Sequence, residues 1–485
     1  MASLRHKTIS GMFWSLLQNV GASGVSFIVT IILARILTPE IFGLVGMLAI
    51  FIQVSQTLVI AGFNEALIQK KTTDEEDYSS VFWLNLAMSL MMYALLFFTA
   101  PLIARFYHQP VLSELTRALS LVFIINAFSY VQEARLRKEM HFKTLTIIHI
   151  PSVILAAVVS IVMAVTGFGV WSLIAMQLVS RFAYAVQIWI YARWTPLITF
   201  NKAKVKKLFS FGGKLMLSAV LNTVYQNIYL VIIGKFFPLS SVGYYQTASK
   251  VVKTPSTTLS SALNSVAFPA FAAVQDDNKR LKDGYKRIIK QVLFWICPAF
   301  ILSAVLAIPL FRLIFGDKWL PAVPFFRLLC IGGIFYPLSS YNLAIVNVKG
   351  RSDLFLKLEV LKKIITTIGI IATVPFGIWP LIGFQAFNAV LAYYINSHFS
   401  GRFIQYPIIE QIKDISPIIG LSILAGFATF LLDHMLTNFP DWLRLITGYS
   451  LGGALYWLIA WLNHFSPYHE FIEIINAKKN QFLLR

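Results

Sequence analysis

The feature that most constrains this chain is a succession of fourteen apolar segments joined by short loops. A helix that spans a bilayer needs about 20 predominantly apolar residues. Only 13% of the residues are charged, roughly half the share in a soluble protein, which excludes a soluble enzyme, a disordered chain and a secreted disulfide scaffold. We predict an all-α polytopic membrane protein. Its fourteen spans are expected at about 11–34, 41–63, 80–104, 113–133, 145–166, 169–192, 212–236, 242–268, 287–311, 322–346, 356–375, 380–400, 415–433 and 442–463.

The basic residues predict how the chain is oriented. With the N-terminus placed in the cytoplasm, 30 of the 41 Lys and Arg residues fall in cytoplasmic segments, seven on the opposite side and four deep in spans. Cytoplasmic loops of membrane proteins retain Lys and Arg. We therefore expect both termini in the cytoplasm and an even number of spans.

A short motif occurs twice and indicates an internal repeat. Residues 168–174 read FGVWSLI and residues 376–382 read FGIWPLI, at the starts of the sixth and twelfth spans. Because six is even, both copies would insert the same way up, as parallel repeats; the alternative is chance agreement among apolar helices. Further matches keep the same order: Pro101 with Pro309, Arg117 with Arg327, and Arg35 and Gly43 with Lys235 and Gly243. The predicted domains are a six-helix lobe at 1–205, a second at 206–410, and two added helices with a cytoplasmic tail at 411–485.

Cations without midplane carboxylates predict an anion site. Charged side chains inside a bilayer are expensive and usually face a cavity or each other. Here the four deep charges are all positive, and the acids beside spans lie near cytoplasmic ends. We expect a water-filled cavity that receives an anion; the alternative is snorkelling or pairing with backbone carbonyls. The candidate residues are Arg181, Lys250, Lys253, Arg327 and Arg117.

Polar stripes on two helices favour a glycan-binding surface. In the seventh span, polar residues recur at helical spacing and would share one face, while the equivalent first span carries a similar stripe. Amide, hydroxyl and phenol groups suit sugar hydroxyls, although they also join helices within membranes. The candidates are Asn222, Tyr225, Gln226 and Tyr229, with Gln18 and Asn19 on the first span.

Motifs for catalysis or metal binding are missing from the sequence. The nucleophile-elbow, phosphate-loop and zinc-protease patterns do not occur, so we expect a transporter without a cofactor rather than an enzyme. Glu65 and His149 are the candidates for ion coupling, and the sequence does not distinguish H⁺ from Na⁺.

Several motifs, in order, resemble one transporter family. They are Lys7–Gly11 (KTISG), Leu33–Leu37 (LARIL) followed by Phe42-Gly43, Phe268–Phe271 (FPAF) with Gln275–Asp277 (QDD), and Phe315–Trp319 (FGDKW). The chain resembles the lipid-linked oligosaccharide flippases of the multidrug/oligosaccharidyl-lipid/polysaccharide superfamily. Within it, the branch of colanic-acid and teichuronic-acid exporters is the most similar.

This resemblance implies an activity and a location. It implies two lobes meeting in a V, alternating access, and an undecaprenyl-diphosphate-linked sugar repeat moved across the bacterial inner membrane. It implies that the last two helices guide the lipid tail and that a polysaccharide polymerase or export machinery is a partner, without nucleic acid. The alternatives are a cation antiporter for drugs or solutes, which needs a buried carboxylate, and a polytopic glycosyltransferase or polymerase, which needs acidic groups on a large outside loop.

Overall fold

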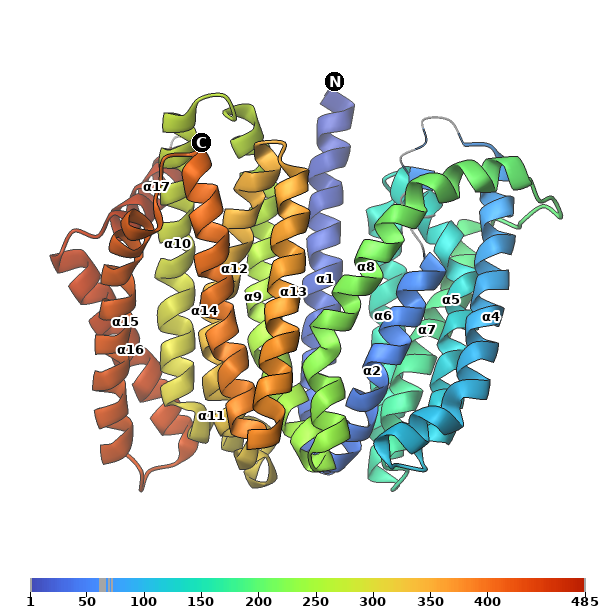
Figure 1. Ribbon diagram of the computed structural model, residues 1–485, viewed down its shortest axis with the longest axis horizontal. Coiled ribbons are helices and arrows are strands. Elements are labelled where there is room, and N and C mark those ends of the chain that lie inside the picture. The colour runs from blue at the N-terminus through green and yellow to red at the C-terminus, as the bar shows by residue number, and fades with distance from the viewer. Residues whose placement is uncertain (1, 61–66, 69, 71–72, 484–485) are drawn as a thin grey trace. The chain divides into compact units, whose positions relative to one another are not determined.

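A computed structural model describes the chain except for residues 1, 61–66, 69, 71–72 and 484–485, and its described residues contain helices but no strand. Packing divides the chain into two compact units, Met1–Gly243 and Tyr244–Arg485, which are considered separately here (Figure 1). The first unit contains α1 (Ala2–Ile36), α2 (Pro39–Ile60), α4 (Glu75–Tyr107), α5 (Leu112–Lys138), α6 (Phe142–Val165), α7 (Val170–Ala192) and α8 (Lys202–Phe236).

The second unit takes in most of α9 and all of the later helices. They are α9 (Leu239–Ala273), α10 (Asn278–Val305), α11 (Ala307–Phe315), η1 (Asp317–Ala322), α12 (Val323–Val348), α13 (Ser352–Thr373), η2 (Val374–Phe376), α14 (Ile378–Phe403), α15 (Ile408–Met435), α16 (Asp441–Leu462) and α17 (Ser466–Leu483).

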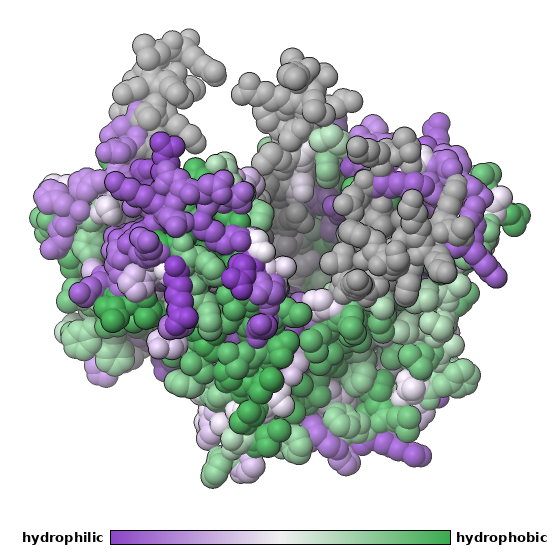
Figure 2. Space-filling view, turned by 45° about the horizontal axis from the view of Figure 1, so that its top comes forward, coloured by the Kyte–Doolittle hydropathy of each residue, from purple (hydrophilic) through white to green (hydrophobic). Residues whose placement is uncertain are grey.

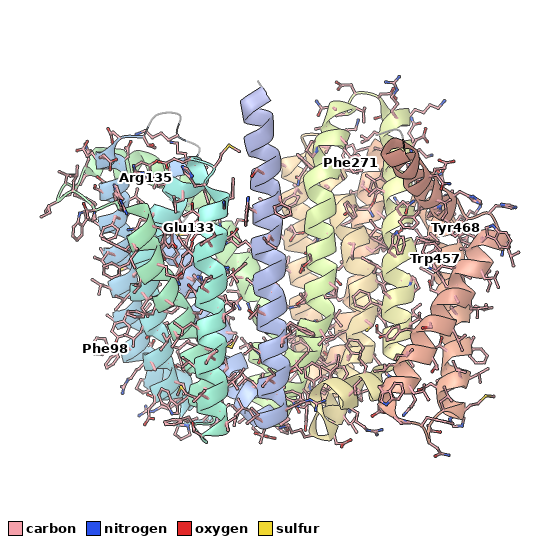
Figure 3. The ribbon with its side chains drawn as sticks, turned by 180° about the vertical axis from the view of Figure 1, so that it is seen from behind. Phe98, Glu133, Arg135, Phe271, Trp457 and Tyr468 are labelled. Atoms are coloured by element: carbon pink, nitrogen blue, oxygen red, sulfur yellow. The ribbon has the colours of Figure 1, made fainter. Side chains whose placement is uncertain are left out.

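The all-helical membrane fold is confirmed. Thirteen of the fourteen predicted segments each overlap one long helix, in the expected order. Within the described residues, 11 helices are long and apolar enough to cross a membrane, while α1, α9 and α13 fall outside this group; the count of fourteen spans therefore stays a prediction. Hydrophobic residues cover the sides of the helices and hydrophilic ones gather at their ends (Figure 2). Phe98, 77% exposed, points away from the bundle as a lipid-facing residue would (Figure 3).

One predicted span is broken. The segment expected at 287–311 divides into α10 and α11, because α10 ends at Val305 and a new helix starts at Ala307. Pro309 lies in the first turn of α11, where proline is tolerated because its missing N–H has no intrahelical partner.

The repeated FGVW and FGIW motifs have the same structural role. Gly169 and Gly377 are the N-cap residues of α7 and α14, with φ angles of 55° and 104°. Residues with a Cβ rarely adopt such angles. The motif therefore marks a turn that needs glycine before each helix, which agrees with the predicted repeat without proving it.

A second pair of glycines permits a reciprocal close contact within the first unit. A Cβ added to Gly43 in α2 would overlap the carbonyl oxygen of Leu239, and one added to Gly243 would overlap the carbonyl oxygen of Pro39. The two hairpins are also matched in position: α1 and α8 end, and α2 and α9 begin, at residues 200 apart. Two equivalent turns thus contact each other through equivalent residues, as at a local two-fold axis.

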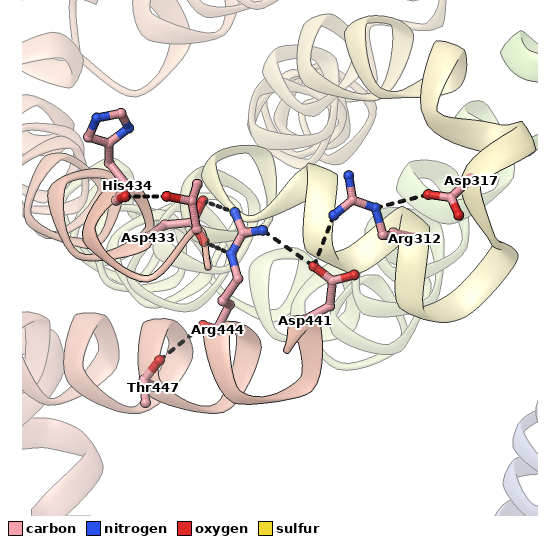
Figure 4. Close-up of polar contacts among 8 residues, drawn as sticks. Arg312, Asp317, Asp433, His434, Asp441, Arg444 and Thr447 are labelled. Carbon is pink, nitrogen blue, oxygen red and sulfur yellow. Dashed lines mark hydrogen bonds and ion pairs between the residues drawn. The ribbon is translucent and has the colours of Figure 1, made fainter. Parts of the chain in front are cut away.

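The two added helices are held to α10 and α11 by ion pairs at both ends. At one end, the buried Arg444, 5% exposed, pairs with Asp433 at 2.8 Å and Asp441 at 3.3 Å (Figure 4). Arg312 of α11 joins the same Asp441 at 3.4 Å and also contacts Asp317 at 3.0 Å. Removing one partner of a buried ion pair strongly destabilises a protein, because the other charge is left buried without compensation. This network therefore holds α15 and α16 against α11.

At the other end, lysines of α10 contact acids of α15. Lys286 lies 2.8 Å from Glu410 and 3.0 Å from Asp414. Lys282 and Lys290 add one contact each, both at 2.8 Å. The buried Tyr406, between α14 and α15, donates its hydroxyl hydrogen bond to Asp414 at 2.7 Å.

Replacing Tyr406 with phenylalanine should lower the free energy of unfolding by about 1.5–3 kcal/mol, because a buried hydrogen bond to a charged acceptor is lost. Thermal unfolding of the purified protein in detergent measures the change. The control is Tyr394→Phe in α14, whose side chain is 51% exposed and should have almost no effect. Equal melting temperatures for the two variants would contradict the prediction.

The last helix, α17, is docked by aromatic and polar contacts. The Trp457 ring of α16 lies 5.4 Å from that of Tyr468 and 5.7 Å from that of Phe471 (Figure 3). Arg287 of α10 pairs with Glu470 at 2.9 Å. The start of α17 is therefore a packed part of the second unit.

Candidate anion-binding site

A polar cavity of about 180 Å³ lies inside the first unit. Helices α1, α2, α5, α6 and α7 surround it. Its lining consists of Ser26, Ile52, Gln56, Val122, Asn126, Val153, Ala156, Met176, Gln177, Ser180 and Arg181. The cavity thus combines one cation, three amides and two hydroxyls with an apolar wall, and its lining contains no carboxylate.

Helix geometry explains why these side chains converge. Gln177, Ser180 and Arg181 occupy positions i, i+3 and i+4 of α7 and so share one face. α7 packs against α5, which contributes Asn126, only 2% exposed. Gln56 approaches from α2. With Ser26 from α1, the polar residues are therefore fixed by four separate helices rather than by a loop.

The structure places the predicted Arg181 in the wall of this cavity. Its side chain is exposed, and it makes no ion pair with a carboxylate among the residues that the structure describes. Glu133 of α5, labelled in Figure 3, lies in the same region but pairs with Arg137 at 2.7 Å. The charge of Arg181 is thus available to an anion that enters the cavity.

His149, the coupling candidate, lies near Arg181 without lining the cavity. Its ring packs edge-on against Tyr184 at 5.6 Å, and Glu133 and Arg181 are both close enough to act on it electrostatically. The other candidate, Glu65, lies outside the described residues. The proximity of Glu133 was not expected, because sequence position placed it only near a helix end.

In the second unit, α9 separates its polar residues onto two faces. Lys250 and Lys253 are exposed, together with Thr254 and Thr257. On the opposite face Ser256 is buried, and its hydroxyl donates to the carbonyl oxygen of Gly333 in α12 at 3.4 Å. The hydroxyl-rich helix therefore uses one face for packing and leaves the lysine face accessible.

Arg117 and Arg327 instead contact backbone carbonyls. Arg117 donates from Nε to Phe97 at 3.3 Å and lies over the Phe97 ring at 4.6 Å. Arg327 donates from Nε to Ala304 at 3.0 Å. These equivalent contacts match the alternative considered for intramembrane cations, and neither arginine lines the cavity.

The stripe predicted on α8 is only partly accessible. Gln226 is exposed, Asn222 and Tyr225 are half-buried, and Tyr229 is buried. Gln18 on α1 is half-buried, and the side chain of Asn19 lies outside the described part of the structure. None of the stripe residues whose side chains the structure describes lines the cavity.

The adjacent face of α8 forms a polar contact with α2 that the stripe did not indicate. Asn227 donates to the side-chain oxygen of Gln53 at 2.9 Å, and the hydroxyls of Thr57 and Thr223 are 3.3 Å apart. Interhelical hydrogen bonds of this kind stabilise membrane helix pairs. The signal in the sequence was the i, i+4 spacing of Thr223 and Asn227.

We expect Asn227→Leu to lower the stability of the protein by about 0.5–2 kcal/mol, since interhelical hydrogen bonds in membranes contribute amounts of this order. A double-mutant cycle with Gln53→Leu should give a coupling energy of about 0.6 kcal/mol. Unfolding in mixed micelles provides the measurement. Strictly additive effects of the two substitutions would show that the pair does not interact.

Comparisons with known proteins agree on family and fold. The polysaccharide biosynthesis protein family matches residues 32–324. The succinoglycan biosynthesis transport protein ExoT of Rhizobium meliloti (strain 1021) is 28% identical over 96% of this chain and 95% of its own. The lipopolysaccharide biosynthesis protein WzxC of Escherichia coli (strain K12) is 25% identical over 93% of this chain and 89% of its own.

Two solved structures share the fold. The inward closed conformation of the lipid II flippase MurJ matches with a TM-score of 0.71 and 14% identity, covering 93% of this chain and 99% of that chain. An inward-facing multidrug transporter of the MATE family matches with a TM-score of 0.61 and 17% identity. The match covers 80% of this chain and 94% of that chain. The second is described as a member of the superfamily that the motifs resemble. At these identities the two structures establish the fold alone.

Proposed function

Because the chain belongs to the polysaccharide biosynthesis protein family, we propose that it is a flippase for an undecaprenyl-diphosphate-linked oligosaccharide repeat. It would move this lipid across the bacterial inner membrane for export of a cell-surface polysaccharide. The observation that carries the proposal is Arg181, a cation in a polar cavity of a multi-span protein with no carboxylate in the cavity lining. A diphosphate is the anion that such a lipid brings into the bilayer.

The transport cycle assigns a task to each part of the molecule. Arg181 in the first unit, and the accessible Lys250 and Lys253 in the second, attract the diphosphate. The polar faces of α1 and α8 accept glycan hydroxyls, while the prenyl chain remains in lipid. Parallel lobes at 1–205 and 206–410 would alternate in exposing the headgroup to either side, as in other transporters built from repeats.

The added helices and the orientation complete the proposal. α15 and α16 are held to the second unit by ion pairs at both ends, so a rigid surface is available for guiding the lipid tail. Both termini are proposed to be cytoplasmic because most basic residues then lie on that side.

Reconstitution tests the proposed function. Purified protein in liposomes should make an undecaprenyl-diphosphate-linked oligosaccharide, initially in the inner leaflet, accessible to an external glycosidase. Protein-free liposomes are the control. In cells, the gene should restore polysaccharide export to a flippase-null strain and remove the accumulated lipid-linked repeat. Failure of wild-type protein in both assays, or efflux of cationic dyes instead, would overturn the proposal.

A further inference from the structure

We propose that the cavity of the first unit is a subsite for a single oxyanion, in which Arg181 supplies the charge and Gln56, Asn126 and Gln177 supply the selectivity. The inference rests on the proposed function, because the oxyanion is taken to be one group of the transported lipid. It goes further by assigning three neutral residues and by limiting what this site can hold.

The size of the cavity sets that limit. Its volume of about 180 Å³ is smaller than the range of about 300–1,000 Å³ that is usual for sites of drug-sized ligands. One phosphate or carboxylate group with its adjoining atoms therefore matches the cavity better than a whole oligosaccharide does.

The chemistry of the lining selects an oxyanion over a neutral or cationic group. A guanidinium presents a planar set of donors that matches carboxylate and phosphate oxygens. Each amide adds two N–H donors, and Ser180 adds a hydroxyl. Val122 and Val153 are among the apolar residues of the lining, and a less polar surrounding strengthens each of these hydrogen bonds. A cation in the cavity would be repelled by the charge of Arg181, and no carboxylate in the lining offsets that repulsion. The lining therefore disfavours cations.

A buried phenol behind the amides provides a second observation. Tyr130 of α5 is 7% exposed and lies beside Gln56, Asn126 and Arg181. Its hydroxyl is close enough to interact with the amides of both Gln56 and Asn126. The phenol therefore contacts two of the three amides that line the cavity.

The oxyanion has two potential sources in the substrate. One is a phosphate of the diphosphate linkage, and the other is the carboxylate of an acidic sugar. Both present the oxygens that Arg181 and the amides bind. Inorganic phosphate and glucuronate are therefore the two probes, with glucose as the neutral sugar and sodium chloride to control for ionic strength.

The experiment uses the full-length protein purified in detergent and titrates each probe by calorimetry. The variants are Arg181→Gln and Gln177→Leu. The matched control for the glutamine is Gln187→Leu, on the same helix but outside the cavity, where Gln187 donates to Ser152 at 2.9 Å. The control for the arginine is Arg280→Gln, an exposed side chain at the start of α10 that lies outside the cavity lining and pairs with Asp277 at 3.3 Å.

We expect wild type to bind at least one anion and not glucose. Arg181→Gln should weaken binding about tenfold or more, since it removes a charge-assisted hydrogen bond, and Gln177→Leu about threefold or more. Both controls should bind as wild type. Binding of phosphate alone identifies the linkage as the source, and binding of glucuronate alone identifies the sugar.

Two results would overturn the subsite: no anion binds the wild type, or Gln177→Leu binds as tightly as Gln187→Leu. These failures are distinguishable from failure of the proposed function. If the protein moves the lipid in liposomes but does not bind the probes, only the subsite proposal is refuted. If it binds the probes with the expected variant pattern but moves no lipid, only the proposed flippase function is refuted.

Discussion

Replacing Arg181 with alanine should abolish polysaccharide export while leaving the protein in the membrane. The substitution removes the one cation in the cavity lining, and hydrogen bonds between a guanidinium and a phosphate or carboxylate contribute about 1.5–3 kcal/mol each. If two or more of these hydrogen bonds form only during translocation, the rate of lipid transport in the Arg181→Ala variant falls by at least about 100-fold. Export of surface polysaccharide in a complemented null strain, with immunoblots of membrane fractions, measures the effect.

Two further variants separate charge from structure. Arg181→Lys keeps the charge but loses the planar donor set, so we expect partial activity. Arg280→Ala removes an exposed arginine that pairs with Asp277 at the same end of α10, and export should continue normally. Normal export by Arg181→Ala would eliminate the anion site on which the proposed mechanism depends.

The second large effect is expected at the glycine contact between equivalent turns. Gly243→Ala places a methyl group against the backbone carbonyl of Pro39, which cannot move aside as a flexible side chain can. Overpacking typically costs about 1–3 kcal/mol and sometimes more, and contact with backbone belongs to the upper end. We expect Gly243→Ala to lose about 3 kcal/mol or to yield little monodisperse protein, and Gly43→Ala to behave alike because the contact is reciprocal.

The same substitution at an open helical position provides the control. Gly420 in α15 has no atom near the position that a Cβ would occupy, so alanine there should add about 0.5–1 kcal/mol through helix propensity. Size-exclusion profiles and melting temperatures in detergent compare the three variants. A Gly243→Ala protein as stable as Gly420→Ala would show that the close contact is absent.

Much of the fold could be predicted because membranes impose a simple rule. A chain in lipid must satisfy its own backbone hydrogen bonds, so long apolar segments become helices. The positions of most long helices followed from hydropathy alone. The repeated motifs were placed at the starts of two helices, and the structure has Gly169 and Gly377 as the N-cap residues there. The exception was the break after Val305, where both α10 and α11 are apolar and hydropathy shows no boundary.

The candidate site was less predictable. Arg181 was identified because a charge is conspicuous among apolar residues, whereas Gln56, Asn126 and Gln177 resemble the many polar residues that join membrane helices. Arg117 and Arg327 were equally conspicuous, yet they contact backbone carbonyls. A side chain's depth in a span does not reveal the helix that it faces.

The amino-acid sequence by itself therefore determined the class of protein, the order of its helices, the sign of the charges deep within its predicted spans and its family resemblance. These properties depend on composition and local spacing, which the bilayer converts directly into helices. Tertiary structure alone decided that three amides from separate helices surround Arg181, that α9 divides its lysines from its buried serines, and that α8 pairs with α2 through Asn227. Within lipid all apolar helix faces are nearly equivalent, so the choice of neighbour depends on side-chain packing and long-range hydrogen bonds that no local pattern specifies.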